Sequence, residues 1–414
     1  MNRGNEASFT RTLAAACAIC LSVLGSALLA ACGSSRPTPG TTPSPVARFY
    51  RLAHPLARRS AGTLIRAEKV PLPLHPPATV WRILYHSRSA SGRDIAVSGF
   101  AVVPASRAKG VRRPVYAWAH GSSGQADRCA PSRDIPDNLP PYGGQLVARN
   151  AVLVATDYQG LGTPGEPTPY VGLAEAHAIL DSIRAAKQLR GVGRLGPVVI
   201  AGQSQGGGAA LWAAQLAHTY APSLDVRGVV ALAPAAELTT IVRSLRKPPF
   251  SVYLGEALWA IDGLKAAYGA RLDVSDLLTP AARADLSRVA KECEQQTIAR
   301  WRGRSLYAVF ARDPLSDRSL VEVLEKNSPG GSDPHVPIFL GQGSQDQVIP
   351  QQVVTHLETR YCRLGANVTR RVYAGADHDG VIDAASNDVL TWIANRVRRR
   401  PMRSSCTPTA AQTP

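Results

Sequence analysis

One serine lies between two glycines in the stretch VVIAGQSQGGGAAL (198–211), in the pattern G-x-S-x-G. A β-branched apolar run precedes the motif and an alanine-rich run follows it, which predicts a strand, a sharp turn and a helix around Ser204. The residues two positions away must be small, because larger side chains would collide with the adjoining strand and helix. Gly202 and Gly206 meet that requirement. The alternative is a Gly/Ser loop that only caps a helix.

A serine hydroxyl is a weak nucleophile at neutral pH and needs a general base, which a third group orients. In the strand–turn–helix arrangement, an acid and then a histidine follow the serine along the chain. Three of the four histidines after Ser204 lie in or next to other predicted elements: His218, His335 and His356. The fourth, His378 in AGADHDGVI, lies on a loop after the last predicted strand. We therefore predict that His378 is the base, the alternative being a histidine at a helix start.

The acid that orients the histidine is predicted to be Asp346. It lies in GQGSQDQVIP, just after the strand VPIFLG and at the same edge of the sheet. Asp157, in ATDYQG, also follows a strand but precedes the serine, so it ranks second. Asp377 and Asp379 adjoin His378, and neighbouring side chains seldom reach the imidazole with good geometry.

Hydrolysis of an ester also needs two backbone N–H donors for the oxyanion of the tetrahedral intermediate. The residue directly after the nucleophile, Gln205, should provide one. The other should come from the loop after the strand PVYAWAHG, where we choose Ser122 and keep Gly121 as the alternative.

This chemistry requires no cofactor and no metal. The run GVGRLG (191–196) fits G-x-G-x-x-G, but it precedes a strand and opens no helix, so we interpret it as a turn and not as a dinucleotide site. No CxxC pair remains after the first 31 residues, which disfavours zinc and thioredoxin chemistry.

Short apolar strands separated by helical patterns must position these residues. An antiparallel pair (79–87 and 94–104) is followed by six brief runs rich in Val, Ile and Ala, which begin at 114, 151, 197, 228, 336 and 368. Continuous apolar runs are typical of strands buried on both faces of a parallel sheet. The predicted fold class is therefore α/β, with a mostly parallel central sheet flanked by helices.

A long interval separates the strands that begin at 228 and 336. It is too long for a simple crossover, and its helical patterns predict a cap or lid over the carboxyl edge of the sheet. We expect a core from residues 47–236 and 336–406, with the lid at 237–335. The stretch from 250 to 264 is interpreted either as an apolar acyl channel or as the core of the lid.

The first residues indicate export. Arg3 and Arg11 precede an apolar run that ends in small residues before Cys32, which predicts a secretory signal at 1–31. The sequence around Cys32 resembles a lipobox, in which diacylglycerol is attached to the cysteine. The Ser/Thr/Pro-rich segment 32–46 is predicted to be a flexible tether. The alternatives are an ordinary signal peptide or a retained anchor helix.

The remaining cysteines and the charge agree with an exported globular protein. An even number of cysteines, Cys129, Cys293, Cys362 and Cys406, suggests two disulfides in an oxidising compartment, and four cysteines permit three pairings. The formal net charge is +17, but the basic residues are scattered rather than arranged in a stripe, so we expect no nucleic-acid partner.

In these motifs the chain resembles the secretory lipase family of the α/β-hydrolase superfamily, which includes fungal lipase A-like enzymes and exported actinobacterial lipases. The resemblance rests on HGSSGQADRCAPS, ATDYQGLGTPG, HAILDSIRAA, GQSQGG, GSQDQVIP and ADHDG. It implies an α/β-hydrolase fold with a helical lid and an acyl-ester hydrolase whose triad is Ser204, Asp346 and His378. It also implies the disulfides Cys129–Cys293 and Cys362–Cys406. The lipobox is a departure from the freely secreted fungal members.

The sequence therefore predicts an exported serine lipase or esterase that acts on an acyl-ester or lipid substrate. It would be held on the outer face of the cell membrane through a lipidated N-terminus, or else be secreted. An acyltransferase with the same triad and a non-catalytic lipid-binding lipoprotein are the alternatives. The acyl-chain preference and the oligomeric state are not readable from the residues.

Overall fold

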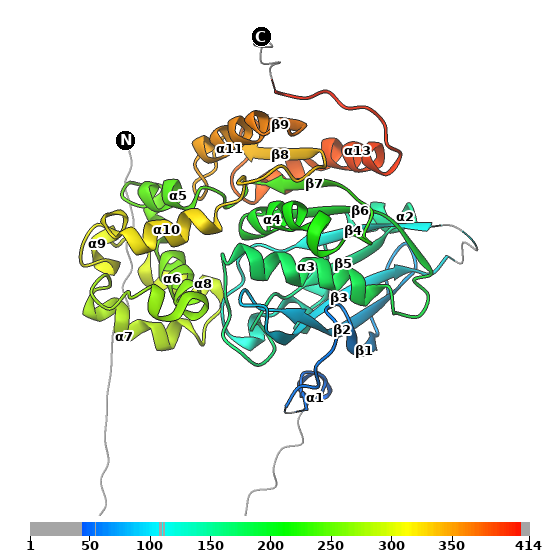
Figure 1. The fold of residues 1–414 in the computed structure, drawn as a ribbon, viewed down its shortest axis with the longest axis horizontal. Coiled ribbons are helices and arrows are strands. Elements are labelled where there is room, and N and C mark those ends of the chain that lie inside the picture. The colour runs from blue at the N-terminus through cyan, green and yellow to red at the C-terminus, as the bar shows by residue number, and fades with distance from the viewer. Residues whose placement is uncertain (1–43, 54, 107–109, 111, 407–414) are drawn as a thin grey trace, which may run out of the picture. The chain divides into compact units, whose positions relative to one another are not determined.

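A sheet with the order β1-β2-β3-β5-β4-β6-β7-β8-β9 runs through the described part of the chain (Figure 1). The computed structural model describes residues 44–53, 55–106, 110 and 112–406, without the side chains of residues 250 and 251. The strands are β1 (Leu64–Val70), β2 (Ala78–Arg88), β3 (Asp94–Pro104), β4 (Arg112–Ala119), β5 (Val152–Thr156), β6 (Arg194–Gln203), β7 (Val226–Leu232), β8 (Ile338–Gly343) and β9 (Val368–Tyr373).

The predicted α/β class is confirmed. The strands from β5 to β9 pair in parallel, whereas β1, β2 and β3 pair antiparallel with one another and β3 pairs antiparallel with β5. In the pairing of β4 with β6, Ala119 lies opposite Gly202. The loop that leaves β4 and the turn that leaves β6 therefore start at the same level of the sheet.

Strand β1 was not predicted from the sequence. Its residues, LIRAEKV, carry three charged side chains, and none of the seven is fully buried. This strand pairs only with β2 at the edge of the sheet. An edge strand needs no continuous apolar run, and charges on it discourage pairing with other chains, so the pattern that revealed the central strands is absent here.

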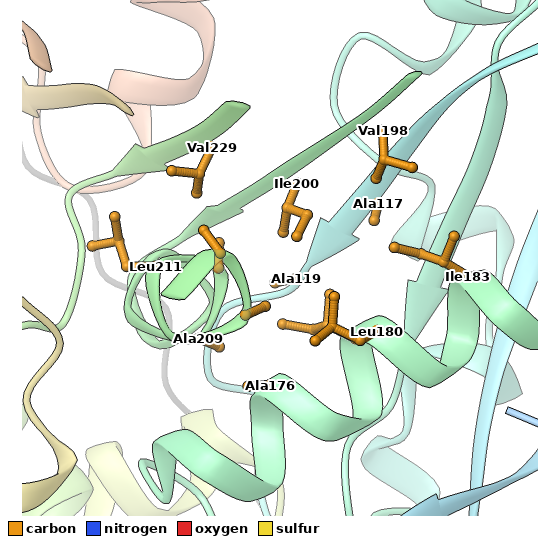
Figure 2. Packing of buried hydrophobic residues seen from close by; sticks show 14 of the residues in the cluster. Ala117, Ala119, Ala176, Leu180, Ile183, Val198, Ile200, Ala209, Leu211 and Val229 are labelled. Atoms are coloured by element: carbon orange, nitrogen blue, oxygen red, sulfur yellow. The ribbon is translucent and has the colours of Figure 1, made fainter. Parts of the chain in front are cut away.

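Helices cover both faces of the sheet. One face packs against α3 (Gly172–Ala186), α4 (Gln205–Tyr220) and α11 (Gln351–Arg363), and the other against α2 (Gly143–Ala148), α12 (Gly380–Ala384) and α13 (Ser386–Val397). Figure 2 shows how Leu180 of α3 and Leu211 of α4 lie against Ala117, Ile200 and Val229 of the central strands. Small residues on the strands let these helices approach the sheet closely.

Between β7 and β8 the chain forms a lid of helices beside the carboxyl ends of the strands (Figure 1). Its helices are α5 (Leu238–Ser244), α6 (Leu254–Tyr268), α7 (Pro280–Val289), α8 (Glu294–Trp301), α9 (Leu306–Val309) and α10 (Arg318–Asn327). Thr279 caps α7, because its hydroxyl accepts a hydrogen bond from Ala282 N at 3.2 Å. A separate apolar cluster, which includes Leu258, Trp301 and Phe310, fills the lid.

The predicted signal peptide (1–31), Cys32 and all of the tether before residue 44 lie outside the described residues. The end of the predicted tether needs a correction. Helix α1 (Pro45–Phe49) begins inside it, with the Ser44 hydroxyl accepting a hydrogen bond from Ala47 N at 3.1 Å. Proline is well suited to the first position of a helix, which explains why an unstructured composition still starts one here. In the described part of the chain, no helix is long and apolar enough to span a membrane.

Two disulfides tie distant parts of the chain together, with the pairing that the family resemblance implies. Cys129, on the short helical turn η1 (Asp127–Cys129), is bonded to Cys293 of the lid. Cys362, at the end of α11, is bonded to Cys406 near the C-terminus. The Cα atoms of each pair are 5.5 Å apart, within the usual range for such bonds.

Loss of the second bond should destabilise the fold. In the double variant Cys362→Ser/Cys406→Ser, we expect the free energy of unfolding to fall by roughly 2–4 kcal/mol, because the unfolded chain regains the entropy of a long loop. Urea denaturation followed by circular dichroism measures this change. An unchanged midpoint would mean that the bond contributes nothing to stability.

Candidate active site

Ser204 lies on a tight turn between β6 and α4 and has a φ of 57°, in a region that residues other than glycine rarely adopt. Neighbouring backbone holds it there. Its N–H donates to the carbonyl of Leu232 at 3.0 Å, and its carbonyl accepts from Ala235 N–H at 2.8 Å. These hydrogen bonds keep the backbone of Ser204 in its strained conformation, and they fix the serine side chain at the end of the sheet.

The glycines on either side of Ser204 leave no room for a side chain. A Cβ atom on Gly202 would collide with the carbonyl of Gly206, and a Cβ on Gly206 would collide with the carbonyl of Ala119. The packing confirms that residues 202 and 206 must be small for steric reasons.

Asp346 and His378 are in direct contact. The Asp346 Oδ2 atom lies 2.9 Å from Nδ1 of His378. The other carboxylate oxygen accepts the backbone N–H groups of Val348 and Ile349, each at 2.8 Å, and Gln342 donates to Oδ2 at 2.9 Å. A carboxylate can only accept, so Nδ1 of His378 carries the proton and Nε2 is left as the basic nitrogen.

The pKa of His378 reflects this contact. Burial lowers the pKa, but the hydrogen bond and the charge of Asp346, together with the charges of Glu256 and Asp379, raise it by more, so that the net shift is upward. A raised pKa makes the imidazole a stronger base and stabilises the imidazolium that proton transfer produces.

A hydrogen bond joins the turn that carries Ser204 to the loop that carries His378. Gln203, the residue before the serine, donates from its amide to the backbone carbonyl of His378 at 3.1 Å. Among the described residues, the Ser204 hydroxyl and the His378 ring make no direct hydrogen bond. In unliganded enzymes such contacts are often long and tighten only with substrate.

The two predicted oxyanion residues lie beside the turn. Gln205 begins α4, so its N–H has no acceptor within the helix. Gly121 approaches closely, because a Cβ on it would lie 3.6 Å from the Cβ of Ser204. Ser122 follows it and directs its hydroxyl to Tyr170 at 3.1 Å. The choice between Gly121 and Ser122 as second donor stays a prediction.

A buried glutamate behind the turn, Glu175, was not predicted from the sequence. The Oε1 atom of Glu175 accepts the side-chain amide of Gln205 at 2.6 Å and the backbone N–H of Tyr170 at 2.9 Å. Burial raises the pKa of Glu175 to about 7, although both hydrogen bonds lower it. Glu175 lies within α3, and nothing in the local sequence distinguishes it from other residues of a helix. Its contacts come from residues that the fold brings to it.

Asp157, ranked second as the acid, is bound elsewhere. Its carboxylate is fully buried and accepts from Ser132 N at 2.9 Å and from the hydroxyl of Ser98 at 2.6 Å. The neighbouring His120 is also buried, which lowers its pKa to about 4 and keeps its ring neutral. His356, another histidine set aside above, pairs with Glu237 at 3.0 Å.

A small, mostly apolar cavity of about 70 Å³ adjoins Ser204. Tyr253, Ala257 and Leu264 line it from the lid, with Tyr170 and Glu256 as polar members. Several residues of α6 pack into the apolar core of the lid, as one interpretation of the 250–264 stretch predicted. The acyl channel stays a prediction. Binding sites for small molecules usually enclose ~300–1,000 Å³, so this cavity is smaller than most of them. No cluster of His, Cys, Asp or Glu suited to a metal ion occurs in the described ranges.

Solved structures share this fold. Lipase A of Candida antarctica in its closed state superimposes with a TM-score of 0.72 at 21% identity, covering 90% of this chain and 89% of that one. A rice cell wall degrading esterase of Xanthomonas oryzae gives a TM-score of 0.68 at 18% identity, covering 82% of this chain and 98% of its own.

Curated relatives are similar over most of their length. A probable inactive lipase of Mycobacterium tuberculosis is 25% identical over 366 residues, which cover 82% of this chain and 79% of the relative. A secreted triacylglycerol lipase of Malassezia globosa is 24% identical, with 84% and 80% covered. The model of the secretory lipase family matches residues 145–405. Because that match spans more than half of the chain and includes Ser204, Asp346 and His378, the chain belongs to the secretory lipase family of hydrolases.

Proposed function

We propose that this protein is an exported carboxylic-ester hydrolase, a lipase or esterase, that works through an acyl-enzyme on Ser204. The observation that carries the proposal is the hydrogen bond between Asp346 and His378, on a loop tied to the strained serine turn. This hydrogen bond leaves Nε2 of His378 as the basic nitrogen, and the helix that begins after Ser204 leaves its first N–H groups without an acceptor in the helix.

In the proposed reaction, Nε2 of His378 takes the proton of the Ser204 hydroxyl while the serine oxygen bonds to the carbonyl carbon of the ester. The oxyanion accepts from the N–H of Gln205 and from that of Ser122 or Gly121. Collapse of this intermediate breaks the bond to the alcohol, which leaves with the proton from His378. Water, deprotonated by the same nitrogen, then releases the acid and restores the serine.

The names of the relatives include both a lipase and a probable inactive lipase. The fungal relative is named a secreted triacylglycerol lipase, whereas the mycobacterial relative is named a probable inactive lipase. A non-catalytic lipid-binding protein is therefore the second candidate. The complete set of serine, acid and histidine in the described residues favours catalysis, and an acyltransferase would differ only in passing the acyl group to an alcohol.

Hydrolysis of p-nitrophenyl esters, from acetate to long acyl chains, tests the proposal in protein lacking residues 1–43. We expect turnover that Ser204→Ala reduces by on the order of 10⁶-fold, because the nucleophile is lost. Ser223→Ala, which alters an exposed serine outside the site, is the matched control. Folded wild-type protein that is as inert as Ser204→Ala would leave lipid binding as the better explanation, and transfer to an added alcohol would indicate the acyltransferase.

The raised pKa of His378 predicts the acid side of the pH profile. Since the base must be neutral, kcat/KM should fall about tenfold for each pH unit below that pKa, with a midpoint above ~6.5, the ordinary value for histidine. A pH series with a short-chain ester measures the midpoint. A midpoint at or below the ordinary value would show that Asp346 and its neighbours do not govern the base.

We also propose that Cys32 carries a diacylglycerol anchor, which the lipobox-like sequence before it supports. Two or more acyl chains hold a protein stably on a membrane, where a single chain does not. In cells fed a radiolabelled fatty acid, the full-length chain should take up label and sediment with membranes, and Cys32→Ala should do neither. Equal labelling of both chains would exclude this anchor.

A further inference from the structure

A ring of hydrogen bonds connects the oxyanion loop to the lid. The Ser122 hydroxyl lies 3.1 Å from the hydroxyl of Tyr170, which donates to Oε2 of Glu256 at 3.3 Å. Glu256 and Glu294 line the same small pocket, where their carboxyl groups face each other within reach of a hydrogen bond. Glu294 closes the ring, because its backbone N–H donates to the carbonyl of Ser123 at 3.1 Å. The ring thus joins α6 and α8 of the lid to the loop that follows β4.

Covalent and backbone links hold the same parts together. Gly124 and Cys293 form an isolated β-bridge, and the N–H of Gln125 donates to the carbonyl of Glu292 at 3.0 Å. The disulfide Cys129–Cys293 follows directly. Glu294 is therefore anchored next to the oxyanion loop, whereas Glu256 reaches the ring only through its side chain.

Two carboxyl groups can form a hydrogen bond with each other only if one of them is protonated, since carboxylates lack a donor. Burial raises the pKa of Glu256 and of Glu294, and the charge of Glu256 raises that of Glu294 further. In Glu256 the charge of His378 and the hydrogen bonds from Tyr170 and Glu294 act in the opposite direction.

Other titratable and hydrogen-bonding groups also face Glu256 and Glu294. Asp379, on the loop after β9, raises the pKa of both carboxyls, and Gln295 donates to Glu294. Further titratable neighbours are Tyr253, beside the cavity, Glu175, behind Tyr170, and Glu292, which lines the same small pocket as the pair. Positive charge close by comes from a protonated His378 and from the more distant Arg302, which acts on Tyr253.

We propose that Glu256 and Glu294 share one proton and act as positioning residues, holding the oxyanion loop in its working geometry through Tyr170 and Ser122. This inference rests on the proposed ester hydrolysis. When the shared proton leaves, two adjacent carboxylates repel each other and the ring opens between Glu256 and Glu294. The disulfide and the backbone links remain, but the side-chain chain from Glu256 through Tyr170 to Ser122 is displaced. Stabilisation of the oxyanion then weakens, so that kcat falls on the alkaline side.

Two variants test the roles of Glu294 and Glu256 separately. In Glu294→Gln the amide N–H₂ group donates to the Glu256 carboxylate at every pH, so the ring should persist. The wild-type kcat should fall about tenfold for each pH unit beyond the alkaline midpoint, whereas Glu294→Gln should stay within about twofold over the same range. Glu256→Gln removes a charge that raises the pKa of His378, so its acid midpoint in kcat/KM should move to lower pH.

Glu325→Gln, which changes an exposed glutamate of the lid outside the ring, is the matched control and should keep both midpoints. If Glu294→Gln and wild type lose activity in parallel as the pH rises, the pair does not position the loop and the proposal fails. The same conclusion follows if Glu325→Gln shifts the alkaline midpoint as much as Glu294→Gln does.

An infrared measurement tests the shared proton without catalysis. In Ser204→Ala protein, the spectrum above neutral pH should contain the carbonyl band of a protonated carboxyl group, and the double variant Ser204→Ala/Glu294→Gln should lack it. Subtracting the two spectra removes the contribution of other buried acids such as Glu175. Absence of a difference band would overturn the proposal. A difference band in a protein without esterase activity would instead reject the proposed function and retain the shared proton.

Discussion

The close approach of β4, β6 and α4 around Ser204 is the constraint on which the site depends. With glycine at 202 and 206, the serine backbone can take a left-handed conformation, and the carbonyl of Ala119 can lie where a side chain would otherwise be. The surrounding sheet supplies the hydrogen bonds that hold this strained turn. Because Ala119 pairs with Gly202, the same packing brings the loop after β4 to the serine, so the proposed nucleophile and the loop proposed to bind the oxyanion are positioned together.

The environment of each carboxyl group decides its chemistry. Asp346 is buried with two backbone N–H groups, the Gln342 amide and the His378 imidazole around it, so both of its oxygens accept hydrogen bonds beside the proposed base. Asp157 is also buried among hydrogen-bond donors, but those donors are serines of the core, so its carboxylate joins loops instead of activating a base. Glu256 and Glu294 face each other, and a hydrogen bond between two carboxyl groups needs the proton that we propose they share.

The lid is not an independent cover. It adds its own apolar core and closes the cavity beside Ser204 to a volume far below that of a lipid, yet it is bonded to the oxyanion loop by a disulfide, a β-bridge and the carboxyl ring. Any motion that admits substrate must leave the segment around Cys293 in place or move the oxyanion loop with it. Helix α6 is also tied to this region, because the Gln125 side-chain amide donates to the carbonyl of Trp259 at 3.1 Å and Tyr170 donates to Glu256 at 3.3 Å.

Local patterns in the sequence determined much of this protein. Continuous apolar runs identified the central strands, because strands buried on both faces leave no polar positions, and G-x-S-x-G identified the turn, because only glycine fits beside it. The order of serine, acid and histidine along the chain led to the prediction of Asp346 as the acid and His378 as the base. The edge strand β1 was missed, since its half-exposed residues lack that pattern. Glu175, Tyr170, Glu256 and Glu294 were not identifiable either, because each acquires its partner from a segment distant in sequence. Only the tertiary structure decided those contacts, since burial and neighbouring charge are properties of the folded chain and not of the local sequence.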